Sequence, residues 1–248
     1  MSGAGQGVRI AMWSGPRNIS TALMRSWGNR PDTAVTDEPL YGYYLRATGL
    51  DHPGRDEIIV AQPTEWREVA DMLTGPIPEG RDIWYQKHMA HHLLKEVDRE
   101  WLKELRHCFL IREPEEVLAS YARTREHVTV DDLGFRQQAE LFQLVGEWSG
   151  TPPPVLHARD VLQNPGAALG RLCGLLGVEF RDEMLWWPAG TRPTDGVWAK
   201  HWYASVEEST GFKPYAPREV TLTAELETIK EACEPHYSLL YAHRLVMD

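Results

Sequence analysis

The segment that most constrains the fold lies near the amino end, where an apolar stretch leads into a tight turn and then a helix. Residues 8–13 have the pattern of a buried strand, and residues 14–18 (Ser-Gly-Pro-Arg-Asn) form a turn before a helical pattern. The first backbone N–H groups of a helix have no partner within the helix, and the helix dipole favours negative charge there. Arg17, Ser20 and Thr21 add charge and hydroxyl donors at the same place. The segment therefore predicts a site for a phosphorylated or sulfated ligand, although an ordinary strand-to-helix turn would leave the same local pattern.

Apolar strand patterns alternate with helical patterns along the whole chain, which predicts βαβ units and an α/β fold. We expect a mainly parallel central sheet between helical layers, a three-layer α/β/α arrangement. In such sheets ligands bind beyond the carboxyl ends of the strands, where the loop after residues 8–13 lies. The expected strands are 8–13, 33–37, 82–87, 107–111 and 155–158, and the expected helices are 19–28, 39–46, 64–73, 90–104, 114–125, 132–148, 165–176 and 220–233.

The length of 248 residues, of which 42% are apolar, suits one well-buried α/β domain and is too short for two full catalytic domains. We therefore expect a single domain over residues 1–248. Residues 1–7 are small and polar and are expected to be a flexible N-terminus. Residues 181–218 are rich in Trp, Pro and Gly without a clear period, and we expect them to form a long loop that covers the substrate or the cofactor.

The formal net charge of −10 argues against a nucleic-acid partner. There is no apolar run of 18 residues and no signal-peptide core, so neither a membrane span nor export is expected. The three cysteines are scattered and form no C-x-x-C pair, which favours a reduced, cytoplasmic location and no zinc site. The oligomeric state cannot be inferred from these features.

The nucleotide-binding string G-x-x-x-x-G-K-[ST] does not occur in the chain. Residues 16–23 instead read Pro-Arg-Asn-Ile-Ser-Thr-Ala-Leu, which resembles the 5′-phosphosulfate loop P-[KR]-S-G-T-T-x-L of sulfotransferases that use 3′-phosphoadenosine 5′-phosphosulfate (PAPS). Ile19 replaces a glycine of that pattern, and glycine permits a positive φ and close backbone approach. The resemblance implies that the 5′-phosphosulfate is bound by Pro16, Arg17, Asn18, Ile19, Ser20 and Thr21.

A second block begins with the apolar strand 107–111 and continues through Arg112-Glu-Pro into a helix that contains Ser120. It resembles the family pattern R-[DN]-P-x-[DE]-x-x-x-S, whose Arg and Ser hold the 3′-phosphate of PAPS. A guanidinium offers a two-pronged fork to phosphate, and a hydroxyl adds a donor. The resemblance assigns these roles to Arg112 and Ser120, while an ion pair between Arg112 and the following glutamates is the simpler alternative.

A third block, residues 85–94, resembles the K-x-H-[LM]-P-x-x-L-L segment in which the histidine removes the proton of the acceptor. On that match His88 is the general base. Gln86 takes the place of the family's lysine, so Lys87 or Arg17 would have to stabilise the leaving group instead. His88, His91 and His92 also allow a metal site, although no third ligand or zinc-protease pattern is evident, and His91 and His92 could simply be exposed or capping.

Glu38 is a competing candidate for the base, since it follows the second strand at the same predicted sheet edge as Arg17. Some sulfotransferases use a glutamate near this position, and nearby tyrosines would raise its pKa by removing water. A carboxylate that balances the dipole of the following helix is the alternative.

Two further stretches match the family more loosely. Residues 156–165 resemble its strand followed by E-D-L-x-x-[DN]-P, which is a scaffold feature. Residues 192–200 resemble its glycine-rich loop with G-x-W-K, which implies that Arg192 or Lys200 reaches the 3′-phosphate, although an aromatic core loop would look the same.

The chain is thus similar to PAPS-dependent sulfotransferases as a family. The resemblance implies a P-loop NTPase-like sulfotransferase fold and transfer of a sulfuryl group from PAPS to a hydroxyl or amine of a small-molecule acceptor. It implies PAP as product, His88 or Glu38 as base, and no metal. A nucleotide or small-molecule phosphotransferase and a non-catalytic PAP-binding protein are the alternatives.

Overall fold

The structure is a computed structural model that describes residues 7–123, 127–217 and 219–247. Apart from Gly7, the expected flexible N-terminus lies outside the described residues. No helix in these ranges is both long and apolar enough to cross a membrane.

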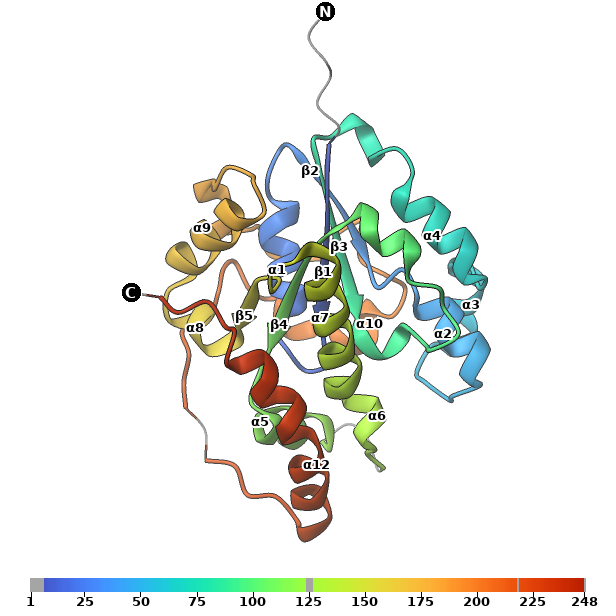
Figure 1. Cartoon of the computed structure of the whole chain (residues 1–248), viewed down its shortest axis with the longest axis vertical. Helices are drawn as coiled ribbons and strands as arrows, with labels where there is room; N and C mark the ends of the chain where they lie inside the picture. The colour runs from blue at the N-terminus through green and yellow to red at the C-terminus, as the bar shows by residue number, and fades with distance from the viewer. Residues whose placement is uncertain (1–6, 124–126, 218, 248) are drawn as a thin grey trace, which may run out of the picture.

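In the described part of the chain, five strands form one parallel sheet in the order β2-β3-β1-β4-β5, which confirms the predicted α/β architecture (Figure 1). β1 lies at the centre, between β3 and β4, so the strand order reverses at its carboxyl end. That reversal opens a crevice between the loops, the usual ligand position in an open parallel sheet. The strands are β1 Val8–Ser14, β2 Thr33–Asp37, β3 Ile83–Met89, β4 Arg106–Ile111 and β5 Val155–His157.

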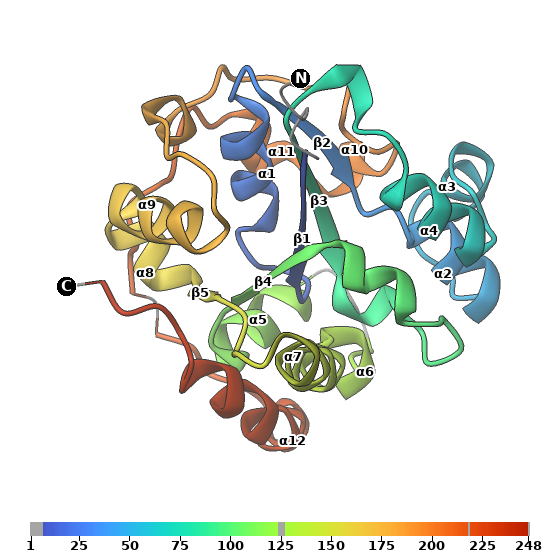
Figure 2. The ribbon, with the colours of Figure 1, turned by 45° about the horizontal axis from the view of Figure 1, so that its top comes forward.

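Successive side chains of a strand point to opposite faces, so the sheet separates two apolar cores. Ala11 and Trp13 of β1 pack into one core, with α4, α7 and α12, while Ile10 and Met12 pack into the other, with α1 and α9 (Figure 2), and α2 contributes to both. The helices are α1 Ser20–Gly28, α2 Tyr41–Thr48, α3 Arg55–Ala61, α4 Trp66–Thr74, α5 Pro114–Tyr121, α6 Val130–Leu133, α7 Phe135–Ser149, α8 Ala158–Gln163, α9 Pro165–Leu175, α10 Ala199–Trp202, α11 Ala204–Glu207 and α12 Ala224–Tyr241.

The helix predicted over 90–104 was wrong, because only the short 3-10 turns Ala90–His92 and Glu100–Glu104 form there. The Arg99 guanidinium donates hydrogen bonds to the carbonyls of Leu93, Leu94 and Val97. These carbonyls are therefore satisfied without a helical ladder, and the apolar side chains still reach the core.

The segment 181–218, expected as one long loop, contains the 3-10 helix Asp182–Leu185 together with α10 and α11. A buried two-pronged ion pair, Arg25 to Asp195 at 2.5 and 2.7 Å, fastens its middle to α1. The segment thereby returns to the carboxyl ends of the strands.

The last described residues lie along β5. The Leu245 amide donates to the Val155 carbonyl at 2.8 Å, and Arg244 forms a parallel bridge with Val155.

Candidate functional site

A cavity of about 450 Å³ opens at the carboxyl ends of the strands, where the sequence predicts the ligand. Residues that end or follow each of the strands contribute to its wall. In sheet order these are Glu38 after β2, Met89 at the end of β3, Arg17 after β1, Arg112 after β4 and Arg159 after β5. The wall therefore changes from acidic at the β2 side to basic at the β4 and β5 side.

The loop after β1 turns tightly between the sheet and α1. A side chain on Gly15 would place its Cβ 2.5 Å from the Leu133 carbonyl oxygen, so only glycine allows this approach. The positive φ of the loop, 56°, lies at Arg17, whereas Ile19 has an ordinary φ of −90°. Ile19 can therefore replace the family's glycine without backbone strain.

All of the residues predicted for the phosphosulfate loop line the cavity, from Pro16 to Thr21. Helix α1 begins at Ser20, and no side chain in the described part of the chain caps its first turn. Its leading N–H groups are therefore available to an anion, with the helix dipole adding to the attraction.

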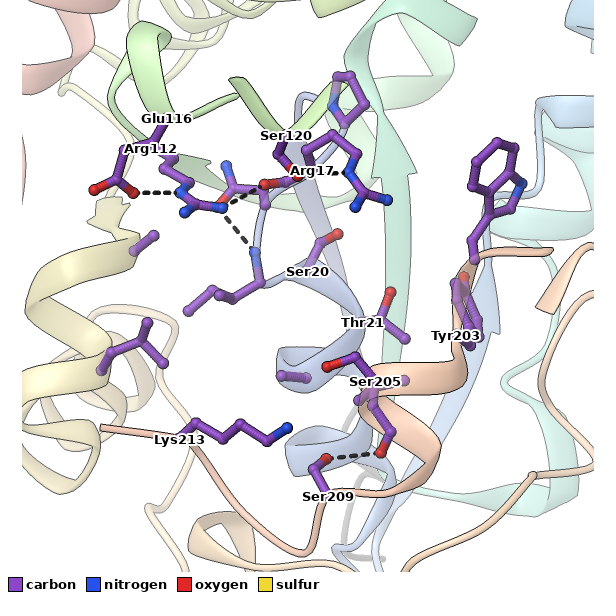
Figure 3. A pocket seen from close by; sticks show the side chains of 18 of the residues that line it. Arg17, Ser20, Thr21, Arg112, Glu116, Ser120, Tyr203, Ser205, Ser209 and Lys213 are labelled. Carbon is purple, nitrogen blue, oxygen red and sulfur yellow. Dashed lines mark hydrogen bonds and ion pairs between the residues drawn. The ribbon is translucent and has the colours of Figure 1, made fainter. Parts of the chain in front are cut away.

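Arg17, Arg112 and Ser120 meet in one hydrogen-bonded group (Figure 3). Arg17 Nε donates to Ser120 Oγ at 2.9 Å, and Arg112 donates to the Arg17 carbonyl at 2.9 Å and to Glu116 at 2.7 Å. The ion pair with a following glutamate, the simpler alternative for Arg112, is thus present. Arg112 nevertheless lines the cavity. Burial and the nearby positive charge of Arg112 lower the pKa of Arg17, as expected for a cation beside a second cation.

The strap, residues 211–216, forms part of the cavity wall and lies within the segment 181–218 that the sequence predicts as a covering loop, although sequence reasoning singled out none of its residues. The strap contributes Lys213 (Figure 3). Its Tyr215 hydroxyl donates to Glu116 at 3.0 Å. Glu116 thus contacts both Arg112 and the strap. The only sequence signal was a lysine in a Gly- and Pro-bounded stretch of the segment 181–218.

Arg192 and Lys200, the late cations predicted for the phosphate, do not line the cavity. The Arg192 guanidinium donates to carbonyls of its own loop, and Lys200 pairs with Glu57 on the surface at 2.6 Å. Lys213 is the late cation that the structure brings to the cavity.

Glu38 lines the cavity and is only 7% exposed, with a positive φ of 40°. Its Oε1 accepts a hydrogen bond of 2.6 Å from the fully buried ammonium of Lys87. Burial raises the pKa of Glu38, the neighbouring Asp37 charge raises it further, and Lys87 opposes both.

His88 does not reach the cavity. Its ring stacks on Trp13 at 4.3 Å and its Nε2 lies 3.3 Å from Gln86 Oε1, on the sheet face opposite α1. Burial lowers the pKa of His88 to about 3. His88 therefore lies apart from the cavity-lining residues Arg17, Arg112 and Glu38.

His91 and His92 are buried, not exposed or capping, and both line the cavity near Glu38. The His92 ring stacks on Tyr41 and Tyr44 at 4.5 and 4.6 Å. Burial lowers the pKa of His91 to about 3 and holds that of His92 well below its usual value, so both rings are neutral at pH 7. Among the described residues no three His, Cys, Asp or Glu side chains are arranged to hold a metal ion.

The cavity combines an uncapped helix start, a cluster of cations and a buried carboxylate, an arrangement typical of transferases. The sequence profile of the family described as "Sulfotransferase domain" matches residues 8–243. The chain belongs to this family, which confirms the resemblance drawn from the motifs.

Solved structures of low sequence identity share the fold. The sulfotransferase domain from the olefin synthase of Synechococcus PCC 7002 has a TM-score of 0.50 at 16% identity, with 97% of both chains covered. A sulfotransferase from Alicyclobacillus acidocaldarius has a TM-score of 0.52 at 13% identity, covering 96% of this chain and 97% of that one.

Two curated relatives from Arabidopsis thaliana are more similar in sequence. Branched-chain-amino-acid aminotransferase-like protein 1 is 36% identical over 237 residues, and protein 2 of that name is 34% identical over 236 residues. The match covers 94% of this chain but only 42% and 41% of the two relatives, so the chain spans less than half their length.

Proposed function

We propose that the protein transfers a sulfuryl group from PAPS to a hydroxyl or amine of a small-molecule acceptor. The observation that supports this most is that one cavity joins the start of α1, with Arg17, Arg112 and Ser120, to the carboxylate of Glu38. The two groups lie on either side of the end of β3, as a donor site and an acceptor site require.

The donor lies over the ends of β1, β4 and β5 in this proposal. The N–H groups at the start of α1 hold the 5′-phosphosulfate, and Arg112 with Ser120 holds the 3′-phosphate. Arg17, which touches Ser120, stabilises the charge that develops on the bridging oxygen. Lys213 and Arg159 add positive charge on the other walls.

The acceptor lies over the ends of β2 and β3, and Glu38 is the base in place of His88. The acceptor gives its proton to Glu38, its oxygen or nitrogen bonds to sulfur, and the sulfur–oxygen bond to the phosphate breaks. The electron pair of that bond leaves on PAP. Glu38 is favoured because it lines the cavity, whereas His88 is sealed behind Trp13.

The first experiment is calorimetry of the purified protein with PAP, ADP and ATP, with and without magnesium. We expect PAP to bind most tightly and without a metal requirement. Arg112→Ala should weaken the binding of PAP at least tenfold, since a charge-assisted contact with a phosphate is lost. Arg136→Ala, which removes an exposed pair with Glu140, is the matched control and should bind normally.

A preference for ATP with magnesium would contradict the proposal in favour of phosphoryl transfer. PAP binding without turnover over a broad set of alcohols, phenols and amines would leave a non-catalytic PAP-binding protein instead.

A further inference from the structure

The Lys87 ammonium is enclosed by three oxygen atoms. It donates to Asp37 Oδ1 at 2.8 Å, to Glu38 Oε1 at 2.6 Å and to the Tyr203 hydroxyl at 2.8 Å. An ammonium has three N–H donors, and all three are used. Lys87 itself is 0% exposed and does not line the cavity.

The saturation of Lys87 excludes one role that the family resemblance allowed. A lysine that stabilises the leaving group must aim an N–H at the donor, and Lys87 has neither a free N–H nor an opening to the cavity. Its contacts all point toward the end of β2 and the segment that carries Tyr203.

The two carboxylate oxygens of Glu38 have different contacts. Oε1 is tied to Lys87, whereas Oε2 accepts no hydrogen bond from any residue that the structure describes and lies 4.0 Å from His92 Nδ1. Since Glu38 lines the cavity and its Oε1 is occupied, Oε2 is the oxygen that remains for a ligand.

The same lysine is shared with a second carboxylate. Asp37 accepts from Lys87 through Oδ1, and from the Tyr203 hydroxyl at 2.7 Å and the Gly196 amide at 3.3 Å through Oδ2. One positive and two negative charges are therefore buried together, which leaves a net negative charge at the acceptor end.

We propose that Lys87 is a positioning residue for acceptor activation, which keeps Glu38 ionised, ties back its Oε1 and presents its Oε2 to the acceptor. The inference rests on the proposed function. The groups that face Glu38 are Asp37 from β2, Lys87 from β3 and His92 from the turn after β3, with Tyr203 behind Lys87. Burial raises the pKa of Glu38 and Lys87 opposes the rise, as the geometry requires.

The test measures the protonation midpoint of Glu38 by carbon NMR of the PAP-saturated protein, in the wild type and in two variants. Asp37→Asn removes a like charge, so the midpoint of Glu38 should fall by about one pH unit, a tenfold change in the protonation equilibrium. Lys87→Met removes the opposite charge, so the midpoint should rise by at least as much. Both variants lose buried bonds, and a purely structural role would lower stability without moving the midpoint in opposite directions.

Lys87→Met leaves two carboxylates buried together and could prevent folding. In that case the two single variants Asp37→Asn and Tyr203→Phe provide the test. Tyr203→Phe should leave Glu38 ionised, because the ion pair with Lys87 persists. Asp131→Asn, which removes an exposed partner of Arg136, is the control and should leave the midpoint unchanged. An unchanged or raised midpoint in folded Asp37→Asn overturns the inference, and PAP binding in the same sample keeps that result separate from a failure of the proposed function.

Discussion

Two residues of the cavity wall have a backbone conformation that side chains usually avoid. Among the described residues three non-glycine positions have a positive φ, and two of them, Arg17 and Glu38, follow β1 and β2 at the cavity. Such conformations cost about 1–3 kcal/mol each and persist where surrounding contacts impose them. Arg17 contacts Ser120 and Arg112. Glu38 contacts Lys87, and its carbonyl accepts a hydrogen bond from the Gln62 side chain at 3.2 Å.

Glu38→Gln tests the choice of base at the residue scale. The amide keeps the shape of the side chain but cannot take a proton, so sulfuryl transfer should fall by about 10²–10⁴-fold while PAP binding is retained. His88→Gln should retain most of the transfer rate, since His88 lies outside the cavity. Both rates are measured as PAP release at saturating PAPS. The opposite ranking of the two variants would restore His88 as the base.

The alternation of side chains along β3 decides which face of the sheet Gln86, Lys87 and His88 occupy, and the sequence pattern could not resolve this. Gln86 and His88 point to the face packed by Trp13, whereas Lys87 points to the face of α1 and Tyr203. A pattern K-x-H places its lysine and histidine on one face, and a shift of one residue moves a side chain to the other. The motif thus located the strand end correctly but not the side chains that face the cavity.

At the element scale, the loop after β1 depends on its close packing against the end of α6. Gly15→Ala would set a methyl group 2.5 Å from the Leu133 carbonyl, so the loop must shift. We expect a loss of about 1–3 kcal/mol in the free energy of unfolding and weaker PAP binding. Gly166→Ala in α9 meets no atom within 4 Å and should leave both nearly unchanged or raise stability slightly.

Urea unfolding and calorimetry with PAP measure the two effects of these alanine substitutions. Normal PAP affinity in Gly15→Ala would show that the loop does not need its present position to hold the donor.

The strap is joined to the donor site through Glu116. Tyr215→Phe removes the hydroxyl that donates to Glu116, a contact worth about 1 kcal/mol, so PAP should dissociate roughly fivefold faster. Hydrogen exchange in residues 211–216 should also rise. Tyr43→Phe, away from the cavity, is the control. Unchanged PAP release with faster exchange would mean that the strap is held by Glu116 but does not retain the donor.

The strands and the loop after β1 could be predicted because their signals are local. The alternation of strand and helix patterns gave the sheet, and the convergence of strand ends explains why Arg17, Arg112 and Ser120 meet. Lys213 could not be predicted in the same way, because the segment that carries it reaches the cavity through distant contacts such as Arg25 with Asp195. From the sequence alone, Lys213 cannot be distinguished from Lys200, which lies on the surface.

On the scale of the whole molecule, histidines buried in both cores make stability depend on pH. Burial lowers the pKa of His88, His91 and His157 to about 3 and that of His107 to about 4, while unfolded histidines titrate near pH 6.5. Below pH 6.5 the unfolded state therefore binds more protons than the native state, and stability falls as the pH is lowered.

We expect the free energy of unfolding to be greatest above pH 6.5 and to fall between pH 6 and pH 4 by up to about 1.4 kcal/mol per pH unit for each such histidine. Urea unfolding at a series of pH values measures the slope. His157→Gln should make the slope shallower. A free energy that stays constant from pH 7 to pH 5 would contradict neutral burial of these rings.

The contact of the last described residues with β5 has a consequence for how molecules of this protein meet. An outer strand offers a row of unpaired amides and carbonyls to any passing strand, and such pairing leads to aggregation. The backbone of Arg244 and Leu245 pairs with Val155 on the outer side of β5, so the chain covers this edge of the sheet with its own backbone. Removing the residues after α12 should thus leave the cavity in place but turn this border into a point at which one molecule can add to another.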